Sequence, residues 1–318
     1  MATARWTAAE MPDLSGKNII VTGANSGIGY EAALEFARKG ARVVLACRNV
    51  EKAAASSDQI KSQCPSAAVE AMALDVSDLA SVRSFAERYR AVNSELYVLC
   101  NNAGVMALPY GRTRDGFELQ FGTNHLGHFA LTGLLLDLMI ATQGARVVTV
   151  SSGAHRLGAI RFDDLNWERG YSKWFAYGQS KLANLLFAYE LQRRLEAVAA
   201  NVISVACHPG YAGTNLQSAG ARVTGSALME RFWEMSNALL SQSASMGALP
   251  TLYAATSPDV RGGDYIGPDG FQEMWGYPVK VSSNVRSHDT AVAARLWTIS
   301  EELTGVRYDA LSASGMSG

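Results

Sequence analysis

Two side chains suited to proton transfer stand four positions apart in this 318-residue chain, in the stretch Tyr177-Gly-Gln-Ser-Lys181. Residues at this spacing lie on one face of an α-helix, so a helix here would bring the phenol and the ammonium together. A phenol has a pKa of about 10, and a neighbouring positive charge favours its ionised form. The pair could therefore move a proton at neutral pH, whereas the alternative is an exposed pair of helix neighbours.

The stretch Thr22-Gly-Ala-Asn-Ser-Gly-Ile-Gly29 predicts a phosphate-binding turn. It follows the apolar run 18–22 and precedes the helical pattern 31–38, and its glycines would let the backbone approach a ligand closely. Backbone N–H groups and the positive end of a helix would then face a diphosphate. The cofactor-binding residues expected from this turn are Gly23, Asn25, Ser26, Gly27, Ile28 and Gly29. The alternative is a tight turn without a ligand.

The ends of the next two strands indicate which dinucleotide would bind. Arg48 follows the run 42–46 at the place where an NAD-binding protein would carry a carboxylate, and an arginine can pair with the 2′-phosphate of NADP. Asp75 and Val76 follow the run 69–74, and the carboxylate could accept a hydrogen bond from the adenine amino group. The alternatives are a solvated arginine after a strand and an acid at the start of a helix.

A second turn of small residues, Asn101-Asn-Ala-Gly104, lies at the end of the fourth apolar run. Small residues allow a ligand or a neighbouring strand to approach the backbone. We therefore expect Asn102, Ala103 and Gly104 to contact the cofactor, although the tetrapeptide alone would be an ordinary turn.

Short apolar runs alternate with longer segments of helical period along most of the chain. The expected strands are 18–22, 42–46, 69–74, 96–100, 146–150 and 202–206, and a last helix is expected over 289–302. Strands that alternate with helices in this way form βαβ units and a parallel sheet with helices on both faces. The fold class is therefore α/β, a single-domain Rossmann-type doubly wound sheet over residues 1–318, with 261–318 as a C-terminal extension.

Taken in order, these motifs resemble the short-chain dehydrogenase/reductase family of classical type. The resemblance covers roughly residues 14–260 and rests on Thr22-Gly-x-x-x-Gly-x-Gly29, Asn101-Asn-Ala-Gly104, Asn124, Ser152, Tyr177-x-x-x-Lys181 and Pro209-Gly-x-x-x-Thr214. Three further stretches are similar to the retinol-dehydrogenase-like and protochlorophyllide-reductase-like branch: Ala46-Cys-Arg48, Asn124-His-Leu-Gly-His-Phe129 and Ser180-Lys-Leu-Ala-Asn184.

The resemblance implies a role for each matching residue. Tyr177 would be the general acid in reduction, Ser152 would hold the substrate oxygen, and Lys181 would lower the pKa of the tyrosine and grip the nicotinamide ribose. Asn124 would anchor a water molecule of a proton relay. The cofactor-binding set would also include Tyr177, Lys181, Pro209, Gly210 and Thr214, with helix capping as the alternative for Thr214.

One departure from many family members is the spacing between the serine and the tyrosine. Ser152 and Tyr177 are 25 positions apart, so the segment 161–168 must loop out between a strand and a helix. Loops of this kind often shape the mouth of a substrate site. The retinol-dehydrogenase-like relatives carry a similar insertion, which supports that branch.

Residues 208–245 are expected to form a substrate lid. Within them, the segment 226–240 places four apolar side chains on one helical face, namely Leu228, Phe232, Met235 and Leu239. The hypothesis is that this stripe lines an apolar pocket and that the substrate is lipophilic; core packing and contact with a membrane surface are the alternatives.

Composition excludes several other classes of function. The formal net charge is −1, which offers no basic field for nucleic acid. The four cysteines are widely spaced and His125 and His128 lie in an apolar stretch without a further donor, so we expect no disulfide scaffold and no metal site.

The absence of a long apolar segment predicts a protein without a membrane span, located in the cytoplasm. The apolar stretch 126–140 could be covered by a second subunit.

The sequence therefore predicts an NADP-dependent oxidoreductase that transfers hydride between the nicotinamide and a lipophilic carbonyl or alcohol, such as a retinoid, a steroid or an aldehyde. Two alternatives stay open. One is reduction of a ring double bond of the protochlorophyllide type, which would need a chromophore pocket. The other is a sensor that holds NADPH without turnover, which would not need the full set of four catalytic residues.

Overall fold

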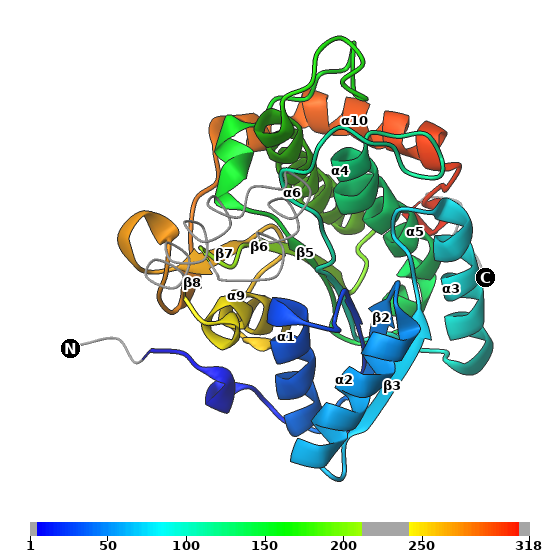
Figure 1. The fold of residues 1–318 in the computed structure, drawn as a ribbon. Helices are drawn as coiled ribbons and strands as arrows, with labels where there is room; N and C mark the ends of the chain where they lie inside the picture. The colour runs from blue at the N-terminus through cyan, green and yellow to red at the C-terminus, as the bar shows by residue number, and fades with distance from the viewer. Residues whose placement is uncertain (1–4, 212–241, 312–318) are drawn as a thin grey trace, which may run out of the picture.

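The computed structural model describes residues 5–211 and 242–311 and has an eight-stranded sheet at its centre (Figure 1). The strands lie in the order β3-β2-β1-β4-β5-β6-β7-β8, and all neighbours are parallel except β7 and β8. Their bounds are β1 (Asn18–Thr22), β2 (Arg42–Cys47), β3 (Ala68–Ala73), β4 (Val98–Asn101), β5 (Ala145–Val150), β6 (Val202–Cys207), β7 (Tyr265–Pro268) and β8 (Pro278–Lys280).

Helices cover both faces of the sheet (Figure 1). Their bounds are α1 (Gly27–Arg38), α2 (Val50–Gln63), α3 (Leu79–Val92), α4 (Leu119–Phe121), α5 (Gly127–Ile140), α6 (Lys173–Ala197), α9 (Ala244–Thr256) and α10 (Thr290–Thr304). Short 3-10 helices lie at Ala8–Glu10, Gly153–Leu157, Phe271–Glu273, Val285–His288 and Asp309–Leu311, and a π-helical turn spans Gly122–Leu126. The predicted doubly wound α/β fold is confirmed.

The two cores follow from the alternation of side chains along each strand. In β1, Ile19 and Val21 pack with α1, α2 and α9, whereas Ile20 packs on the opposite face with α3, α5 and α6. All three side chains are fully buried. A strand buried on both faces must be apolar at every position, which is why the sequence shows continuous apolar runs rather than alternation.

The C-terminal region completes the sheet, which the sequence reading did not foresee. Strands β7 and β8 have four and three residues and contain Gly267, Pro268 and Pro278, so they lack the β-branched runs by which the other strands were recognised. The predicted last helix is present as α10, and its Trp297 stacks on Phe187 of α6.

The apolar stretch 126–140, which we expected a second subunit could cover, is covered in part by the chain itself. The apolar stretch 126–140 forms the end of the π-helical turn and α5, and the chain's own C-terminal segment packs against it. The Tyr308 hydroxyl donates to the carbonyl oxygen of Phe129 at 2.7 Å, and Val306 and Tyr308 lie directly against Gly133. Burial within the chain accounts for part of the apolar character of this stretch, while Leu134, Leu138 and Ile140 stay partly exposed.

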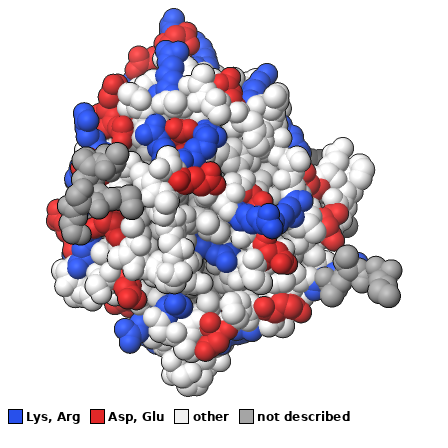
Figure 2. All heavy atoms as spheres, turned by 180° about the vertical axis from the view of Figure 1, so that it is seen from behind, with Lys and Arg blue, Asp and Glu red and all other residues white. Residues whose placement is uncertain are grey.

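Charged side chains of both signs are interspersed on the face shown in Figure 2. Cys47, Cys100 and Cys207 are buried as free thiols, and Cys64 is partly buried. Among the described residues, no helix has the length and apolar character needed to cross a membrane, and no cluster of three or more His, Cys, Asp or Glu side chains could hold a metal ion.

Candidate active site

The predicted phosphate-binding turn joins the end of β1 to the start of α1. Gly23 and Gly27 have positive φ angles of 68° and 57°, which side chains other than glycine rarely adopt. Ser26 precedes the helix but its side chain makes no capping hydrogen bond. The first N–H groups of α1 therefore have no side-chain acceptor there, and they and the positive end of the helix dipole can receive an anion.

The third glycine of the turn, Gly29, allows close packing of the backbone. A Cβ atom at Gly29 would lie 2.5 Å from Nδ2 of Asn102 and 2.6 Å from the carbonyl oxygen of Gly23. Asn102 Nδ2 in turn donates to the carbonyl oxygen of Thr22 at 2.7 Å. Gly29 thus allows the turn 101–104 to lie beside the phosphate-binding turn, and the two predicted cofactor segments are neighbours.

Arg48 follows β2 at the carboxyl edge of the sheet. The register pairs Thr22 with Ala46, and the buried thiol of Cys47 lies against the backbone of residues 23–25. The Arg48 side chain is exposed and has no hydrogen-bond or ion-pair partner within the described residues. It is therefore a free positive charge beside the phosphate-binding turn.

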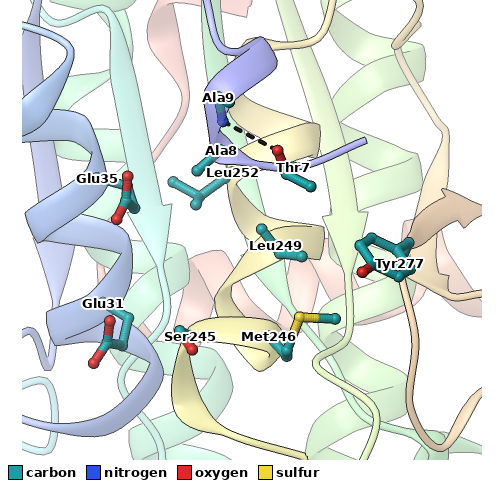
Figure 3. A pocket seen from close by; sticks show the side chains of 10 residues that line it. All are labelled: Thr7, Ala8, Ala9, Glu31, Glu35, Ser245, Met246, Leu249, Leu252 and Tyr277. Carbon is teal, nitrogen blue, oxygen red and sulfur yellow. Dashed lines mark hydrogen bonds between the residues drawn. The ribbon is translucent and has the colours of Figure 1, made fainter. Parts of the chain in front are cut away.

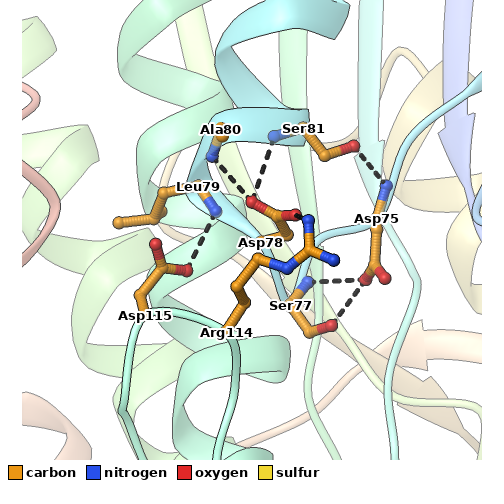
Figure 4. Close-up of polar contacts among 8 residues, drawn as sticks. All are labelled: Asp75, Ser77, Asp78, Leu79, Ala80, Ser81, Arg114 and Asp115. Carbon is orange, nitrogen blue, oxygen red and sulfur yellow. Dashed lines mark hydrogen bonds and ion pairs between the residues drawn. The ribbon is translucent and has the colours of Figure 1, made fainter.

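Asp75 is held in place by its neighbours rather than acting as a helix cap (Figure 4). Its Oδ1 accepts from the backbone N–H and the hydroxyl of Ser77 at 2.9 and 2.6 Å, and its own N–H donates to Ser81 Oγ at 2.9 Å. The acid that caps α3 is Asp78, which accepts from Ala80 and Ser81 N–H groups. No hydrogen bond engages Oδ2 of Asp75 within the described chain, so this oxygen can receive a ligand donor.

Val76, the other residue expected at the adenine, lies against α5. A Cβ atom at Gly127 would lie 1.9 Å from the carbonyl oxygen of Val76, so only glycine fits there. This contact explains the glycine in the stretch Asn124-His-Leu-Gly-His-Phe129. It also fixes the end of β3 relative to the helix turn that carries Asn124.

Tyr177 and Lys181 share one face of α6, as their spacing predicts, and both are buried, with 5% and 4% of their surface exposed. The Lys181 ammonium lies 5.7 Å from the centre of the Tyr177 ring and donates to the carbonyl oxygen of Val150 at 3.1 Å. Burial lowers the pKa of Lys181 to about 8. It also raises the pKa of Tyr177 to about 12, against a smaller lowering by a hydrogen bond with Ser152.

This result differs from the expectation that Lys181 lowers the pKa of the phenol. Burial is the largest influence on Tyr177, because the charged phenolate loses its hydration inside the protein. In this structure burial therefore keeps the phenol protonated at neutral pH. That state suits a general acid for reduction of a carbonyl.

The two adjacent serines after β5 have separate partners. The Ser151 hydroxyl is buried and donates to the carbonyl oxygen of Lys181 at 2.8 Å, so it ties β5 to α6. Ser152 Oγ accepts from the N–H of Ala154 at 3.2 Å, and the Ser152 side chain is near enough to the phenol to lower the pKa of Tyr177. The choice of Ser152 over Ser151 agrees with this arrangement.

Asn124 lies in the π-helical turn, and its side chain is fully engaged. Its Oδ1 accepts from the N–H of Val105 at 2.8 Å, and its Nδ2 donates to the Val105 carbonyl oxygen and to Ser180 Oγ, each at 2.9 Å. The Asn124 amide thereby joins the segment that follows β4, at Val105, to Ser180 of α6. Both Nδ2 protons are used, so the backbone carbonyl of Asn124 is the better group to hold a water molecule.

The insertion between Ser152 and Tyr177 packs onto the segment that follows β4. Asn166 Oδ1 accepts from the N–H of Glu118 at 2.9 Å, and the Tyr171 hydroxyl donates to the Leu108 carbonyl oxygen at 2.8 Å. Arg161 stacks over Trp167 at 4.4 Å within the loop. The extra residues thus loop out between β5 and α6, as the spacing predicted, and pack on the segment that follows β4.

Pro209 and Gly210 follow β6 at the same edge of the sheet. Gly210 has a φ angle of 66°, and a Cβ atom there would lie 2.4 Å from the carbonyl oxygen of Met274. Thr214 and the stripe of Leu228, Phe232, Met235 and Leu239 lie outside the described residues. The two described ranges meet here, because the Gln242 N–H donates to the Tyr211 carbonyl oxygen at 3.0 Å.

Sequence reasoning missed part of the supporting structure. The Thr22 hydroxyl accepts from the N–H groups of Asn102 and Ala103, each at 2.9 Å, and it also contacts His128 Nε2 at 2.9 Å. His125 and His128 are both 1% exposed, in agreement with the core packing that was expected. His128 lies one helical turn beyond Asn124, and this spacing could have predicted that the two residues contact each other.

A separate hollow of about 290 Å³ lies between the 3-10 helix Ala8–Glu10, α1 and α9 (Figure 3). Its walls include Met246, Leu249 and Leu252 of α9, and the carboxylates of Glu31 and Glu35 come from α1. None of the predicted catalytic residues lines it. It is therefore not the site formed by Ser152, Tyr177 and Lys181.

A nicotinamide dinucleotide fits the arrangement of these residues. The two left-handed glycines and the uncapped N-terminus of α1 suit a diphosphate, and Asp75 with its free oxygen suits an adenine. Lys181 Nζ lies 3.5 Å from the position that a Cβ atom of Gly104 would take, so the ammonium reaches the second cofactor turn. These segments lie at the carboxyl ends of parallel strands, where open α/β sheets bind their ligands.

Comparison with known proteins agrees with this geometry. Residues 17–222 match the short chain dehydrogenase family. Retinol dehydrogenase 12 of Mus musculus is 43% identical over 298 residues, which are 93% of this chain and 89% of that protein. Retinol dehydrogenase 13 of Homo sapiens is 42% identical over 300 residues, which are 92% and 86% of the two chains.

A solved structure is similar over nearly the full length. The crystal structure of an uncharacterized protein from Mycobacterium paratuberculosis has a TM-score of 0.79 and 44% identity, and the match covers 96% of this chain and 99% of that one. The chain therefore belongs to the short-chain dehydrogenase/reductase family, within its retinol-dehydrogenase-like branch, and is an NAD(P)-dependent oxidoreductase that acts on alcohols or carbonyls.

Proposed function

We propose that the protein uses NADP(H) to interconvert a lipophilic carbonyl compound and its alcohol. The observation that carries the choice of NADP is the exposed, unpartnered Arg48 at the end of β2, beside the phosphate-binding turn. A guanidinium forms paired hydrogen bonds with a phosphate, whereas the ribose hydroxyl of NAD is bound best by a carboxylate. No carboxylate stands at positions 47–49.

The cofactor supplies hydride to the carbonyl carbon, or accepts it from the alcohol carbon, and the protein handles the proton. In reduction, the Ser152 and Tyr177 hydroxyls hold the carbonyl oxygen, and Tyr177 gives its proton to that oxygen as negative charge develops there. The raised pKa keeps Tyr177 protonated before this step. In oxidation the same phenol must first lose a proton.

Lys181 and Asn124 would support this transfer. The Lys181 ammonium lies near the Tyr177 ring and near Gly104, so it can hold the nicotinamide ribose and favour the phenolate that reduction leaves behind. A water molecule on the Asn124 carbonyl would connect the lysine to solvent. These roles, with those of Gly23, Gly27, Asp75 and Gly210 toward the cofactor, are part of the proposal.

The substrate is proposed to be lipophilic because aromatic side chains lie exposed near the phenol. Trp174 and Phe175 in the first turn of α6 are 44% and 52% exposed, and the Trp174 ring lies 6.4 Å from that of Tyr177. Tyr110, which is 43% exposed, contacts Tyr171 of the insertion. We propose that this rim and a lid formed by residues 208–245 bind an apolar substrate, in one domain extended by residues 261–318.

The choice of NADP is tested with Arg48→Ala. Dissociation constants for NADPH and NADH are measured by quenching of tryptophan fluorescence, with Arg42→Ala as the control because Arg42 lies at the opposite end of β2. Loss of a charge-assisted bond should weaken NADPH binding about 10- to 100-fold and leave NADH binding within about twofold. Equal losses for both nucleotides would remove the reason for assigning NADP.

The substrate class is tested with a panel of retinoid, steroid, fatty and aromatic aldehydes and ketones of increasing size. Wild-type kcat/KM should rise with the apolar area of the substrate. Trp174→Ala should lower kcat/KM for the large substrates about tenfold and change it little for a two-carbon aldehyde, because the small substrate does not reach the rim. A kcat/KM that is independent of apolar area in both proteins would contradict a lipophilic substrate.

A further inference from the structure

His128 lies at the junction of three segments that the site depends on. The side chain is 1% exposed in the first turn of α5. Its Nδ1 lies 3.0 Å from the backbone carbonyl oxygen of Asn124, and its Nε2 lies 2.9 Å from the hydroxyl oxygen of Thr22. Asn124 and Thr22 are 102 positions apart in sequence, so this ring connects the catalytic helix turn to the end of β1.

The hydrogen bonds determine the tautomer of this ring. A carbonyl oxygen can only accept, so Nδ1 must carry a proton and donate to Asn124. Burial, with a contribution from Lys181, lowers the pKa of His128 to about 4, and the ring is therefore neutral at physiological pH. Nε2 is then an acceptor, and the Thr22 hydroxyl must donate to it.

The same hydroxyl orders the second cofactor turn. Thr22 Oγ1 accepts from the N–H groups of Asn102 and Ala103, each at 2.9 Å, which uses both of its lone pairs. Its single proton can go to His128 at 2.9 Å or to the Cys100 carbonyl oxygen at 3.3 Å, and the shorter contact favours the histidine. The turn 101–104 thus rests on a hydroxyl whose orientation His128 sets.

On its other side the ring holds the Asn124 carbonyl. The amide of Asn124 is already used by Val105 and Ser180, so its backbone oxygen is the group left for a relay water. The bond from His128 at 3.0 Å fixes the direction of this carbonyl. The π-helical turn, which lacks the regular α-helical hydrogen-bond pattern, makes such a side-chain anchor useful.

We propose that His128 is a positioning residue of the reaction, which locks the cofactor turn 101–104 through Thr22 and the relay carbonyl of Asn124 through its other nitrogen. It touches neither substrate nor cofactor. The inference rests on the proposed function, because it assigns a purpose to the cofactor turn and to Asn124. Nε2 acts on cofactor binding through Thr22, and Nδ1 acts on proton transfer through Asn124, so substitutions can test the two effects separately.

The first test examines the ring itself in the protein without added nucleotide. Nitrogen NMR of protein labelled with ¹⁵N-histidine distinguishes the two neutral tautomers, and His128→Asn assigns the signal. We expect a neutral ring with the proton on Nδ1 throughout pH 6–9. A proton on Nε2, or a charged ring at pH 7, would overturn the proposal.

The second test uses two substitutions that each keep one contact. In His128→Asn the amide takes the place of Nδ1 and keeps the bond to Asn124, so NADPH affinity should fall about five- to tenfold with kcat nearly unchanged. In His128→Gln the longer amide reaches the place of Nε2 and keeps the contact with Thr22. Its kcat should fall about five- to tenfold with NADPH affinity nearly unchanged.

The matched control is His125→Gln, because His125 is equally buried but contacts Ser300 Oγ at 2.9 Å instead of the cofactor turns. Its melting temperature should fall while kcat and NADPH affinity of the folded protein stay unchanged. If both His128 variants behave like this control, or lose kcat and affinity together in proportion to stability, His128 is only structural. If wild-type protein binds neither NADPH nor NADH, the proposed function itself is wrong, whatever the variants show.

Discussion

Gly158 and Gly178 lie in direct backbone contact. A Cβ atom on Gly158 would lie 2.3 Å from the carbonyl oxygen of Gly178, and one on Gly178 would lie 2.9 Å from the carbonyl oxygen of Ala154. The first glycine ends the short helix that follows Ser152, and the second follows Tyr177 in α6. This contact brings the serine to the phenol although 25 positions separate them in sequence.

Gly158→Ala should therefore damage the site through the backbone. The added methyl group must push the segment 153–158 away from α6, and overpacking of this kind costs about 1–3 kcal/mol. We expect a lower melting temperature and a fall in kcat of about tenfold or more, measured by calorimetry and steady-state kinetics. Gly153→Ala is the control, since nothing lies within 4 Å of the new Cβ atom. Equal kcat values for the two variants would show that the contact does not position Ser152.

Tyr177→Phe removes the proposed acid and leaves the ring in place. General acid catalysis contributes about 10²–10⁴-fold, so kcat for carbonyl reduction should fall by at least about 100-fold. NADPH affinity, measured by fluorescence, should change little. Tyr189→Phe serves as the control, because Tyr189 lies about three turns further along α6 and its hydroxyl bonds to Ser283 instead. If Tyr177→Phe keeps more than about a tenth of wild-type kcat, the assignment of the acid is wrong.

The sequence predicted the features of the candidate site that depend on local spacing. Tyr177 and Lys181 share a helix face because of the helical period, and Gly23 and Gly27 adopt the left-handed angles that a phosphate-binding turn requires. The short strands β7 and β8 were missed because three or four residues with glycine and proline carry no periodic signal. The contacts of His128 were also missed, since its partner Thr22 is 106 positions away. Side-chain packing at such distances depends on the tertiary fold.

The buried Lys181 predicts a specific dependence of stability on pH. Burial lowers the pKa of Lys181 from its ordinary value of 10.5 to about 8, so the unfolded chain binds more protons between these two pH values. Below pH 8 the buried ammonium therefore costs the folded state its full penalty. The nearby Cys207 thiol has a pKa raised to about 12 by burial and stays neutral over this range. Lys181→Met should remove this dependence.

The measurement is the free energy of urea unfolding of wild type and Lys181→Met at intervals from pH 7 to 10. The stability of the wild type relative to the variant should increase above pH 8, by at most about 3 kcal/mol, as the cost of the buried charge disappears. Lys280→Met is the control, because this lysine is exposed and pairs with Asp264. A difference between wild type and Lys181→Met that is constant with pH would mean that the ammonium keeps its ordinary pKa when buried.

The free carboxylate oxygen of Asp75 leads to a prediction about how the adenine of the cofactor binds. Ser77 fixes one carboxylate oxygen and leaves the other without a hydrogen bond in the described chain. If this oxygen accepts from the adenine amino group as proposed, Asp75→Ala should weaken NADPH binding about 10-fold or more. The hypoxanthine analogue of NADPH lacks that amino group and should bind wild type and variant almost equally. Asp115→Ala is the control, since Asp115 accepts from the Leu79 N–H in the same cluster of acids (Figure 4). Because only the amino group differs between the two nucleotides, equal losses for both in Asp75→Ala would show that Asp75 shapes the loop and does not bind the base.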